Sequence, residues 1–370
     1  MLLRRKMCVA VIIAAILFLM FASQSIHRRN FLPLSLALPI SRATPTGRET
    51  LVEETTPPPA DLTLDPSRTT SPPSIEEPED AEEKSEDSLS CGCTESCISD
   101  LEGSEWFSQR YDPKQQPVLR DTDNNFDRDA LRWWLGLQRS GNDQTLEDVM
   151  SEMFKVISSP TVDFRPLPSR CRSCAVVGNS GKLRHSGNGN LIDTHESVIR
   201  MNKAVTRGFE KDVGNRTTHH FLYPESAVDV GPGVRLVLLP FKLRDLEWLT
   251  SALSTGQVKM TYMRVKDRIE ADKDKVLVVN PVFFKYVNDR WTEHHGRYPS
   301  TGMLAIIFAL HICDQVSVFG YGADQQGNWH HYWEENRYAG AFRKTGVHSA
   351  DFETQVIHQL AKEGKISLHL

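Results

Sequence analysis

Two histidines near the C-terminal end of the chain could transfer protons. His348 precedes a helix expected over 352–357, and the positive end of that helix disfavours an imidazolium ring. A neutral imidazole in a cleft can take a proton from a hydroxyl. His331 lies in the aromatic segment 329–333, which reads Trp-His-His-Tyr-Trp. Each histidine, taken singly, also fits an ordinary surface or core position.

A turn in front of an apolar helix offers hydroxyls and a phenol. Residues 298–302 read Tyr-Pro-Ser-Thr-Gly and precede a buried, almost wholly apolar helix expected over 303–313. Ser300 or Thr301 is a natural cap after the proline-fixed turn. The free N–H groups of this helix end, two hydroxyls and Tyr298 would suit an anion such as phosphate. Ordinary capping explains the hydroxyls but leaves Tyr298 without a role.

An earlier stretch carries amide side chains at the ends of two short apolar runs. The run 175–177 leads into Gly-Asn-Ser-Gly at 178–181, and the run 197–201 ends on Asn202. A strand that delivers a Gly/Asn/Ser turn at its carboxyl end is where open α/β sheets bind nucleotides. Asn179 and Asn202 offer donors and acceptors to a base or a ribose. A strand and a polar turn without a ligand is the alternative that the spacing leaves open.

The elements that must position these residues alternate along the chain. The expected strands are short, continuous and apolar, and helical stretches separate them. Such a pattern predicts a mostly parallel sheet covered on both faces. We therefore expect an α/β fold, a single large domain with a mostly parallel central sheet flanked by helices. Strands are expected at 175–177, 197–202, 234–239, 276–279 and 316–319, and helices at 143–157, 244–254, 303–313 and 352–357.

Metal binding is not predicted. The Asp-x-Asp triplets at 121–123, 127–129 and 272–274 lie in highly polar surroundings and fit solvated loops or helix starts. Adjacent histidines rarely direct both rings at one ion, and neither His330 nor His331 has an obvious third ligand. We expect no metal and no other cofactor.

The N-terminal part of the chain reads as a membrane anchor followed by a stem. Three basic residues precede an uncharged apolar run, an arrangement that keeps the N-terminus in the cytoplasm. We expect a cytoplasmic tail at 1–6 and an uncleaved signal anchor at 7–23, with a cleaved signal peptide as the alternative. Residues 24–90 are expected to be a disordered stem, because 41–90 hold eight prolines and 13 acidic against 4 basic side chains.

The remainder, 91–370, is expected to be a lumenal domain. It is close to neutral, because the acidic stem accounts for the net charge of −5, and nothing in it resembles a nucleic-acid footprint. Asn215 opens an N-glycosylation sequon, Asn-Arg-Thr, in keeping with lumenal exposure. The six cysteines outside the anchor suggest three disulfides in an oxidising compartment. No second cysteine pair has zinc spacing, so the Cys-x-x-Cys pair at 171–174 does not predict zinc.

Together these pieces resemble an animal sialyltransferase, from residue 91 to the C-terminus. The amino-acid sequence of residues 298–303, 329–333 and 342–348 resembles that of the β-galactoside α-2,3-sialyltransferases that act on Galβ1-3GalNAc. The resemblance implies the sialyltransferase variant of the GT-A fold and a CMP-sialic acid donor. It also implies a single-pass type II Golgi membrane protein with a lumenal catalytic domain. Whether the stem is cut to release a soluble form stays open. The four family motifs resemble 171–218, 280–322, 331–334 and 348–353 in this chain.

The resemblance also implies the site residues. His348 would be the general base on the galactose 3-hydroxyl, and His331 would stabilise or protonate the departing phosphate. Gln138, at the end of the aromatic run 133–138, would bind the acceptor together with Tyr298. Core packing is the alternative role for that aromatic run. The donor would contact Asn179, Asn202, Tyr262, Tyr298, Ser300, Thr301, Gly302 and Gly322, with the two tyrosines on the phosphate.

Disulfide pairings come from the same resemblance. The large and small family motifs are joined by a disulfide, which here means Cys174 to Cys313. In the Galβ1-3GalNAc subgroup the other pairs would be Cys93 with Cys171 and Cys91 with Cys97.

The implied activity is an inverting, metal-independent transfer of sialic acid to the galactose 3-hydroxyl of Galβ1-3GalNAc on O-glycans or glycolipids. A single departing phosphate needs less charge neutralisation than a diphosphate does. A helix N-terminus, two phenols and an imidazole would therefore suffice without a divalent ion. An inactive lumenal protein that binds glycans like a lectin, through the same cleft, is the alternative. The choice between glycoprotein and glycolipid acceptors stays open.

Overall fold

The described part of the chain is one α/β unit. A computed structural model describes residues 98, 100–138, 144–161, 171–323, 327–335 and 346–369. All of them belong to one compact unit, 80–370. The expected tail, signal anchor and stem, at 1–6, 7–23 and 24–90, lie outside these residues. Within the described ranges no helix is both long and apolar enough to cross a membrane.

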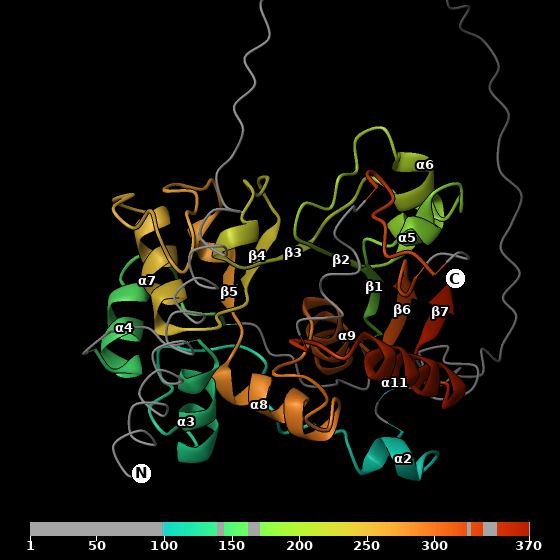
Figure 1. Cartoon of the computed structure of the whole chain (residues 1–370), viewed down its shortest axis with the longest axis horizontal. Helices are drawn as coiled ribbons and strands as arrows, with labels where there is room; N and C mark the ends of the chain where they lie inside the picture. The colour runs from blue at the N-terminus through green and yellow to red at the C-terminus, as the bar shows by residue number, and fades with distance from the viewer. Residues whose placement is uncertain are drawn as a thin grey trace, which may run out of the picture. The chain divides into compact units, whose positions relative to one another are not determined.

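A parallel sheet forms the centre of this unit. Its seven strands lie in the order β5-β4-β3-β2-β1-β6-β7 (Figure 1). Each pair of neighbouring strands runs parallel, so the predicted parallel sheet is confirmed, and all five expected strands are present. The strands are β1 (Ser173–Val177), β2 (Ser197–Met201), β3 (His219–Leu222), β4 (Arg235–Leu238), β5 (Val276–Val278), β6 (Gln315–Phe319) and β7 (Ser367–His369).

Helices connect the strands and cover both faces of the sheet. The four expected helices are present as α4, α7, α9 and α11, each with shifted ends. Thr145 caps α4 in a reciprocal capping box with Asp148, whereas the other candidate cap, Asp143, lies outside the described residues. The helices are α2 (Glu105–Ser108), α3 (Arg128–Leu137), α4 (Leu146–Met153), α5 (Gly189–Thr194), α6 (Glu210–Val213), α7 (Leu243–Ala252), α8 (Pro281–Arg290), α9 (Thr301–Ile312) and α11 (Ala350–Lys362).

Side chains on each strand alternate between two apolar clusters. On β1, Cys174 and Val176 pack with α8 and α9, whereas Ala175 and Val177 pack with α5 on the opposite face. That opposite face is divided, because over β4 and β5 it is covered by α3, α4 and α7 instead. Burial on both faces is the physical reason for strands that read as continuous apolar runs.

Two strands were missed, and the central one of these, β3, begins with two histidines. His219 and His220 are 5% and 9% exposed. Burial lowers the pKa of His219 to about 3, so its ring is neutral. The Nε2 atom of His220 lies 2.7 Å from the carbonyl oxygen of Asn202 and donates to it. Neutral, hydrogen-bonded imidazoles are compatible with a core position, although their polarity interrupts the apolar run by which a strand is recognised.

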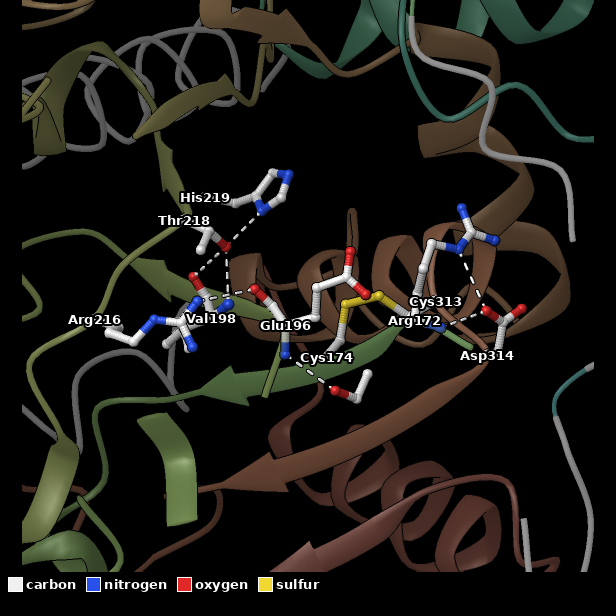
Figure 2. Close-up of a disulfide and its surroundings, with 10 residues drawn as sticks. Arg172, Cys174, Glu196, Val198, Arg216, Thr218, His219, Cys313 and Asp314 are labelled. Carbon is white, nitrogen blue, oxygen red and sulfur yellow. Dashed lines mark hydrogen bonds and ion pairs between the residues drawn. A yellow bond between two sulfur atoms is a disulfide. The ribbon is translucent and has the colours of Figure 1, made fainter. Parts of the chain in front are cut away.

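A disulfide ties the start of β1 to the end of α9. Cys174 and Cys313 have Cα atoms 6.0 Å apart, so the pairing implied by the resemblance is confirmed. Figure 2 shows the bond beside the ion pair of Arg172 and Asp314, whose Nε and Oδ2 atoms are 3.3 Å apart. Cys171 is also disulfide-bonded. The other expected cysteines, Cys91, Cys93 and Cys97, lie outside the described residues.

Candidate active site

The order in which the chain adds strands to the sheet reverses between β1 and β6. The loops that follow these two strands are in close contact. From β1 the chain adds β2 to β5 on one side and then returns to add β6 on the other. A Cβ atom on Gly178 would lie 2.4 Å from the carbonyl oxygen of Gly320, so this contact admits only glycine. The Ser180 hydroxyl donates to the Gly322 carbonyl at 2.7 Å. Ligands of open α/β sheets bind at such a switch point.

A cavity of about 350 Å³ lies at this contact. Its wall combines the loops after β1, β2 and β6, the N-terminus of α9 and the start of α11. Residues from widely separated parts of the sequence therefore meet in one place. The predicted site residues found there are Asn179, Asn202, Ser300, Thr301, Gly302, Gly322, His331 and His348.

Two asparagines present unpaired acceptors at this cavity. The Asn179 amide donates through Nδ2 to the Met201 carbonyl at 3.1 Å, which fixes the orientation of the side chain. Asn202 has a φ of 58°, a left-handed conformation that asparagine tolerates. The buried Oδ1 atoms of both residues have no hydrogen-bond donor within the described ranges. A buried acceptor without a partner beside a cavity fits a ligand that brings hydroxyl or amine donors.

The N-terminus of α9 is held by a buried carboxyl group. Ser300 caps the helix by accepting from the Met303 N–H at 3.1 Å. Its own N–H donates to Glu353 Oε1 at 2.8 Å, and its hydroxyl donates to the other carboxyl oxygen. Burial raises the pKa of Glu353 to about 7. The predicted cap is confirmed, and the free end of the helix faces the cavity, where it favours an anion.

His348 is oriented as a proton acceptor. Its Nδ1 atom lies 2.9 Å from the carbonyl oxygen of Tyr298. A carbonyl can only accept, so Nδ1 carries the proton and Nε2 keeps its lone pair when the ring is neutral. Burial lowers the pKa of His348. A neutral ring was expected from the dipole of the following helix, whereas the principal cause found here is burial.

His331 lines the same cavity as His348. Its Nδ1 lies 3.0 Å from Glu334 Oε1 and donates to it. The ring stacks on Trp333 with centroids 4.6 Å apart, and its backbone pairs with Ser180 in the loop after β1. Glutamate and tryptophan together therefore fix the position of a histidine that is 34% exposed.

A second cavity of about 490 Å³ adjoins the first. Gln138, Tyr262 and Tyr298 line it, and His348 lines both cavities. Burial raises the pKa of Tyr298, and the Gln138 side chain opposes this by hydrogen bonding to the phenol. Tyr262 is 64% exposed. The two tyrosines that were expected at the phosphate thus line the cavity that also contains Gln138, with His348 between the two spaces.

A family model described as glycosyltransferase family 29 (sialyltransferase) matches residues 118–365. The chain belongs to this family. The match spans every described strand except β7 and includes His331 and His348 of the cavity wall.

Curated relatives of this sialyltransferase act on β-galactosamides according to their names. A CMP-N-acetylneuraminate-beta-galactosamide-alpha-2,3-sialyltransferase 2 from Mus musculus is 54% identical over 280 residues, which cover 75% of this chain and 79% of the relative. The corresponding sialyltransferase 1 from Homo sapiens is 50% identical over 281 residues, covering 75% and 82%.

Solved structures of mammalian sialyltransferases share the fold. One crystal structure superposes with a TM-score of 0.70 at 46% identity, covering 76% of this chain and 98% of that one. A second, in complex with Gal-beta-1-3GalNAc-ortho-nitrophenol, has a TM-score of 0.68 at 46% identity, covering 74% and 97%. The predicted fold class and family are thereby confirmed.

Two acidic residues of the sialyltransferase were not assigned a role from the sequence. Glu353 lies in the same short motif as His348, so its place in that motif was an available signal. Glu225 lines the second cavity, yet nothing in the sequence around it marks it. Among the described residues no group of three or more His, Cys, Asp or Glu side chains could hold a metal ion. Asp127 and Asp272, from the Asp-x-Asp triplets, cap α3 and the short 3-10 helix Lys273–Lys275.

Proposed function

We propose that this protein transfers sialic acid from CMP-sialic acid to the galactose 3-hydroxyl of Galβ1-3GalNAc. The observation that carries the proposal is the pair of adjoining cavities with His348 in the wall of both. One space offers amide acceptors and a helix N-terminus, and the other offers an amide and two phenols. A group-transfer enzyme needs two substrate spaces that meet at the reacting atoms.

The first cavity takes the donor. Asn179 and Asn202 accept hydrogen bonds from the ribose or the cytosine amine, while Gly302 and Gly322 leave room for the nucleotide. The N-terminus of α9, with Ser300 and Thr301, faces the phosphate. Supporting this, the two Oδ1 atoms have no donor in the described structure. His331 stabilises or protonates the phosphate as it leaves.

The second cavity takes the acceptor. Gln138 and Tyr298 bind the sugar, and Tyr262 and Tyr298 reach the phosphate from this side. Nε2 of His348 removes the proton of the 3-hydroxyl as the oxygen attacks the anomeric carbon opposite the departing phosphate. The carbon passes through an oxocarbenium-like state, and one displacement inverts its configuration.

Metal independence belongs to the same proposal. The leaving group is a nucleoside monophosphate, and the polar groups of the α9 end, Tyr262, Tyr298 and His331 would stabilise its charge. The lumenal Golgi location, the anchor at 7–23 and glycosylation of Asn215 also remain proposals; Asn215 is exposed, as a glycan requires.

The test is a transfer assay with the full-length chain, CMP-sialic acid and Galβ1-3GalNAc, with and without a chelator. We expect α-2,3-linked product at equal rates in both conditions, and little product on Galβ1-4GlcNAc. Analysis of the linkage by NMR distinguishes the 3-hydroxyl from the 6-hydroxyl. Absence of product would contradict the proposed activity. Loss of activity in the chelator, restored by a divalent ion, would contradict metal independence.

A further inference from the structure

A buried group of three charged side chains includes one residue that lines the second cavity. Lys242, just before α7, stands between Glu225 and Asp245. The Lys242 Nζ atom is 2.6 Å from Asp245 Oδ1 and 3.5 Å from Glu225 Oε1. The three side chains are 4%, 5% and 0% exposed. Because burying such charges costs free energy that mutual attraction barely offsets, a cluster like this calls for a role other than stability.

The three charges differ in their relation to the cavity. Asp245 does not line it and accepts from Lys242 and from the Phe241 N–H at 2.8 Å. Glu225 is the only one of the three that lines the cavity. Its Oε1 atom accepts from Lys242 and from the Thr261 hydroxyl. Within the described ranges no group donates to Oε2, and this atom is not among the fully enclosed ones.

The chemistry of the two substrates decides which of them such an oxygen would bind. The donor carries a phosphate and a carboxylate, and a second carboxylate would repel both. The acceptor is a neutral sugar whose hydroxyls donate hydrogen bonds, and a charged acceptor atom strengthens such bonds. Gln138 and Tyr298 line the same cavity as Glu225, and His348 marks where the reacting hydroxyl must lie.

We infer that Glu225 is an acceptor-binding residue whose Oε2 accepts a hydrogen bond from a galactose hydroxyl other than the 3-hydroxyl, with Lys242 as its counter-ion. The inference rests on the proposed function and adds to it a residue that discriminates between acceptors. A sugar that lacks or inverts that hydroxyl leaves a buried carboxylate oxygen without a donor, which costs more than a lost neutral bond.

The experiment compares wild type with Glu225→Gln in the full-length chain, using Galβ1-3GalNAc and its 2-, 4- and 6-deoxygalactose analogues. Asp229→Asn is the matched control, because Asp229 also pairs with a lysine, Lys266, but is exposed and outside the cavity. We expect Glu225→Gln to raise the acceptor KM about tenfold or more and to leave the donor KM unchanged. With wild type, the acceptor KM for one deoxy analogue should exceed that for Galβ1-3GalNAc by a similar factor. With the variant, the acceptor KM for the same analogue should be almost equal to that for Galβ1-3GalNAc.

A purely structural role for Glu225, such as holding Thr261, predicts a different result. Each deoxy analogue would then raise the acceptor KM, relative to Galβ1-3GalNAc, by the same factor with the variant as with wild type. That outcome overturns the inference. An unchanged acceptor KM or a raised donor KM overturns it as well. Should Glu225→Gln not fold, Glu225→Asp keeps the charge on a shorter side chain and must show the same selective loss of sensitivity. Absence of transfer by wild type overturns the proposed function itself, whereas normal wild-type transfer with an insensitive variant overturns only the role of Glu225.

Discussion

The Nδ1 atom of His348 lies 2.9 Å from the carbonyl oxygen of Tyr298, and the rings of the two residues meet edge to face with centroids 5.1 Å apart. The backbone of Tyr298 therefore selects the tautomer of His348. His348 lines both cavities, and Tyr298 lines the second. Because the carbonyl cannot donate, Nε2 is the atom left to accept a proton.

Replacement of His348 tests its role as base. We expect His348→Ala to lower kcat by about 10³-fold, within the range that a positioned general base contributes, while CMP still binds. His348→Gln is the matched variant, since it keeps a polar group but cannot accept a proton near neutral pH. Steady-state rates and calorimetric CMP binding measure the two effects. Near-normal turnover of either variant would remove His348 from the role.

The pH profile gives an independent test of the same residue. Burial lowers the pKa of His348 from its ordinary 6.5. A base works when unprotonated, so the acid limb of the kcat/KM profile should be centred below pH 6.5. The acid limb should be lost in the residual activity of His348→Gln. An acid limb centred above pH 6.5, or one that the variant retains, would contradict the assignment.

Glu353 should make the stability of the protein depend on pH. Burial raises the pKa of this carboxyl to about 7 from its ordinary value of 4.5. Between these values the folded state binds the extra proton, so the free energy of unfolding falls as pH rises from 4.5 to 7, by about 3 kcal/mol. Glu353→Gln, which still hydrogen-bonds Ser300, should flatten this decline. Urea unfolding at pH 5 and pH 7 measures this decline. An equal loss of unfolding free energy between the two pH values in wild type and variant would refute the prediction.

The disulfide between Cys174 and Cys313 should contribute strongly to stability. It closes a loop with a sequence separation of 139 residues. In the chain-entropy model, loss of such a link destabilises the fold by about 5 kcal/mol. The double variant Cys174→Ala/Cys313→Ala leaves no unpaired thiol and tests this by its urea midpoint. A midpoint within error of wild type would show that packing of β1 against α9 suffices.

Substitution of Asn179 or Asn202 should weaken binding of the donor and leave binding of the acceptor unchanged. We expect Asn179→Ala to raise the KM for CMP-sialic acid about tenfold, because it removes both the ligand bond and the bond to Met201. For Asn202 the matched change is Asn202→Gly, since glycine tolerates its φ of 58° and alanine would add backbone strain. The acceptor KM should not change for either variant. A rise in acceptor KM, measured at saturating donor, would move these residues out of the donor site.

Local patterns in the sequence were sufficient for most of the sheet and for the family. The runs at 175–177 and 316–319 are apolar because both faces of their strands are buried, so they could be recognised without knowledge of any partner. The cap at Ser300 is likewise local, because proline and a hydroxyl act on neighbouring backbone groups. β3 could not be recognised in this way, because it begins with two histidines. These rings are neutral only because the surrounding fold buries them.

Tertiary structure alone decided which of these residues share a space. It brought His331 and His348 to one cavity and moved Tyr262 and Tyr298 to the next. It also buried Glu353 against Ser300 and Glu225 against Lys242, pairs separated by 53 and 17 positions. Sequence determines which elements form because hydrophobic periodicity and capping act over a few residues. Pairing of charges and the walls of a cavity depend on the order in which parallel strands assemble, and this order is a property of the whole fold.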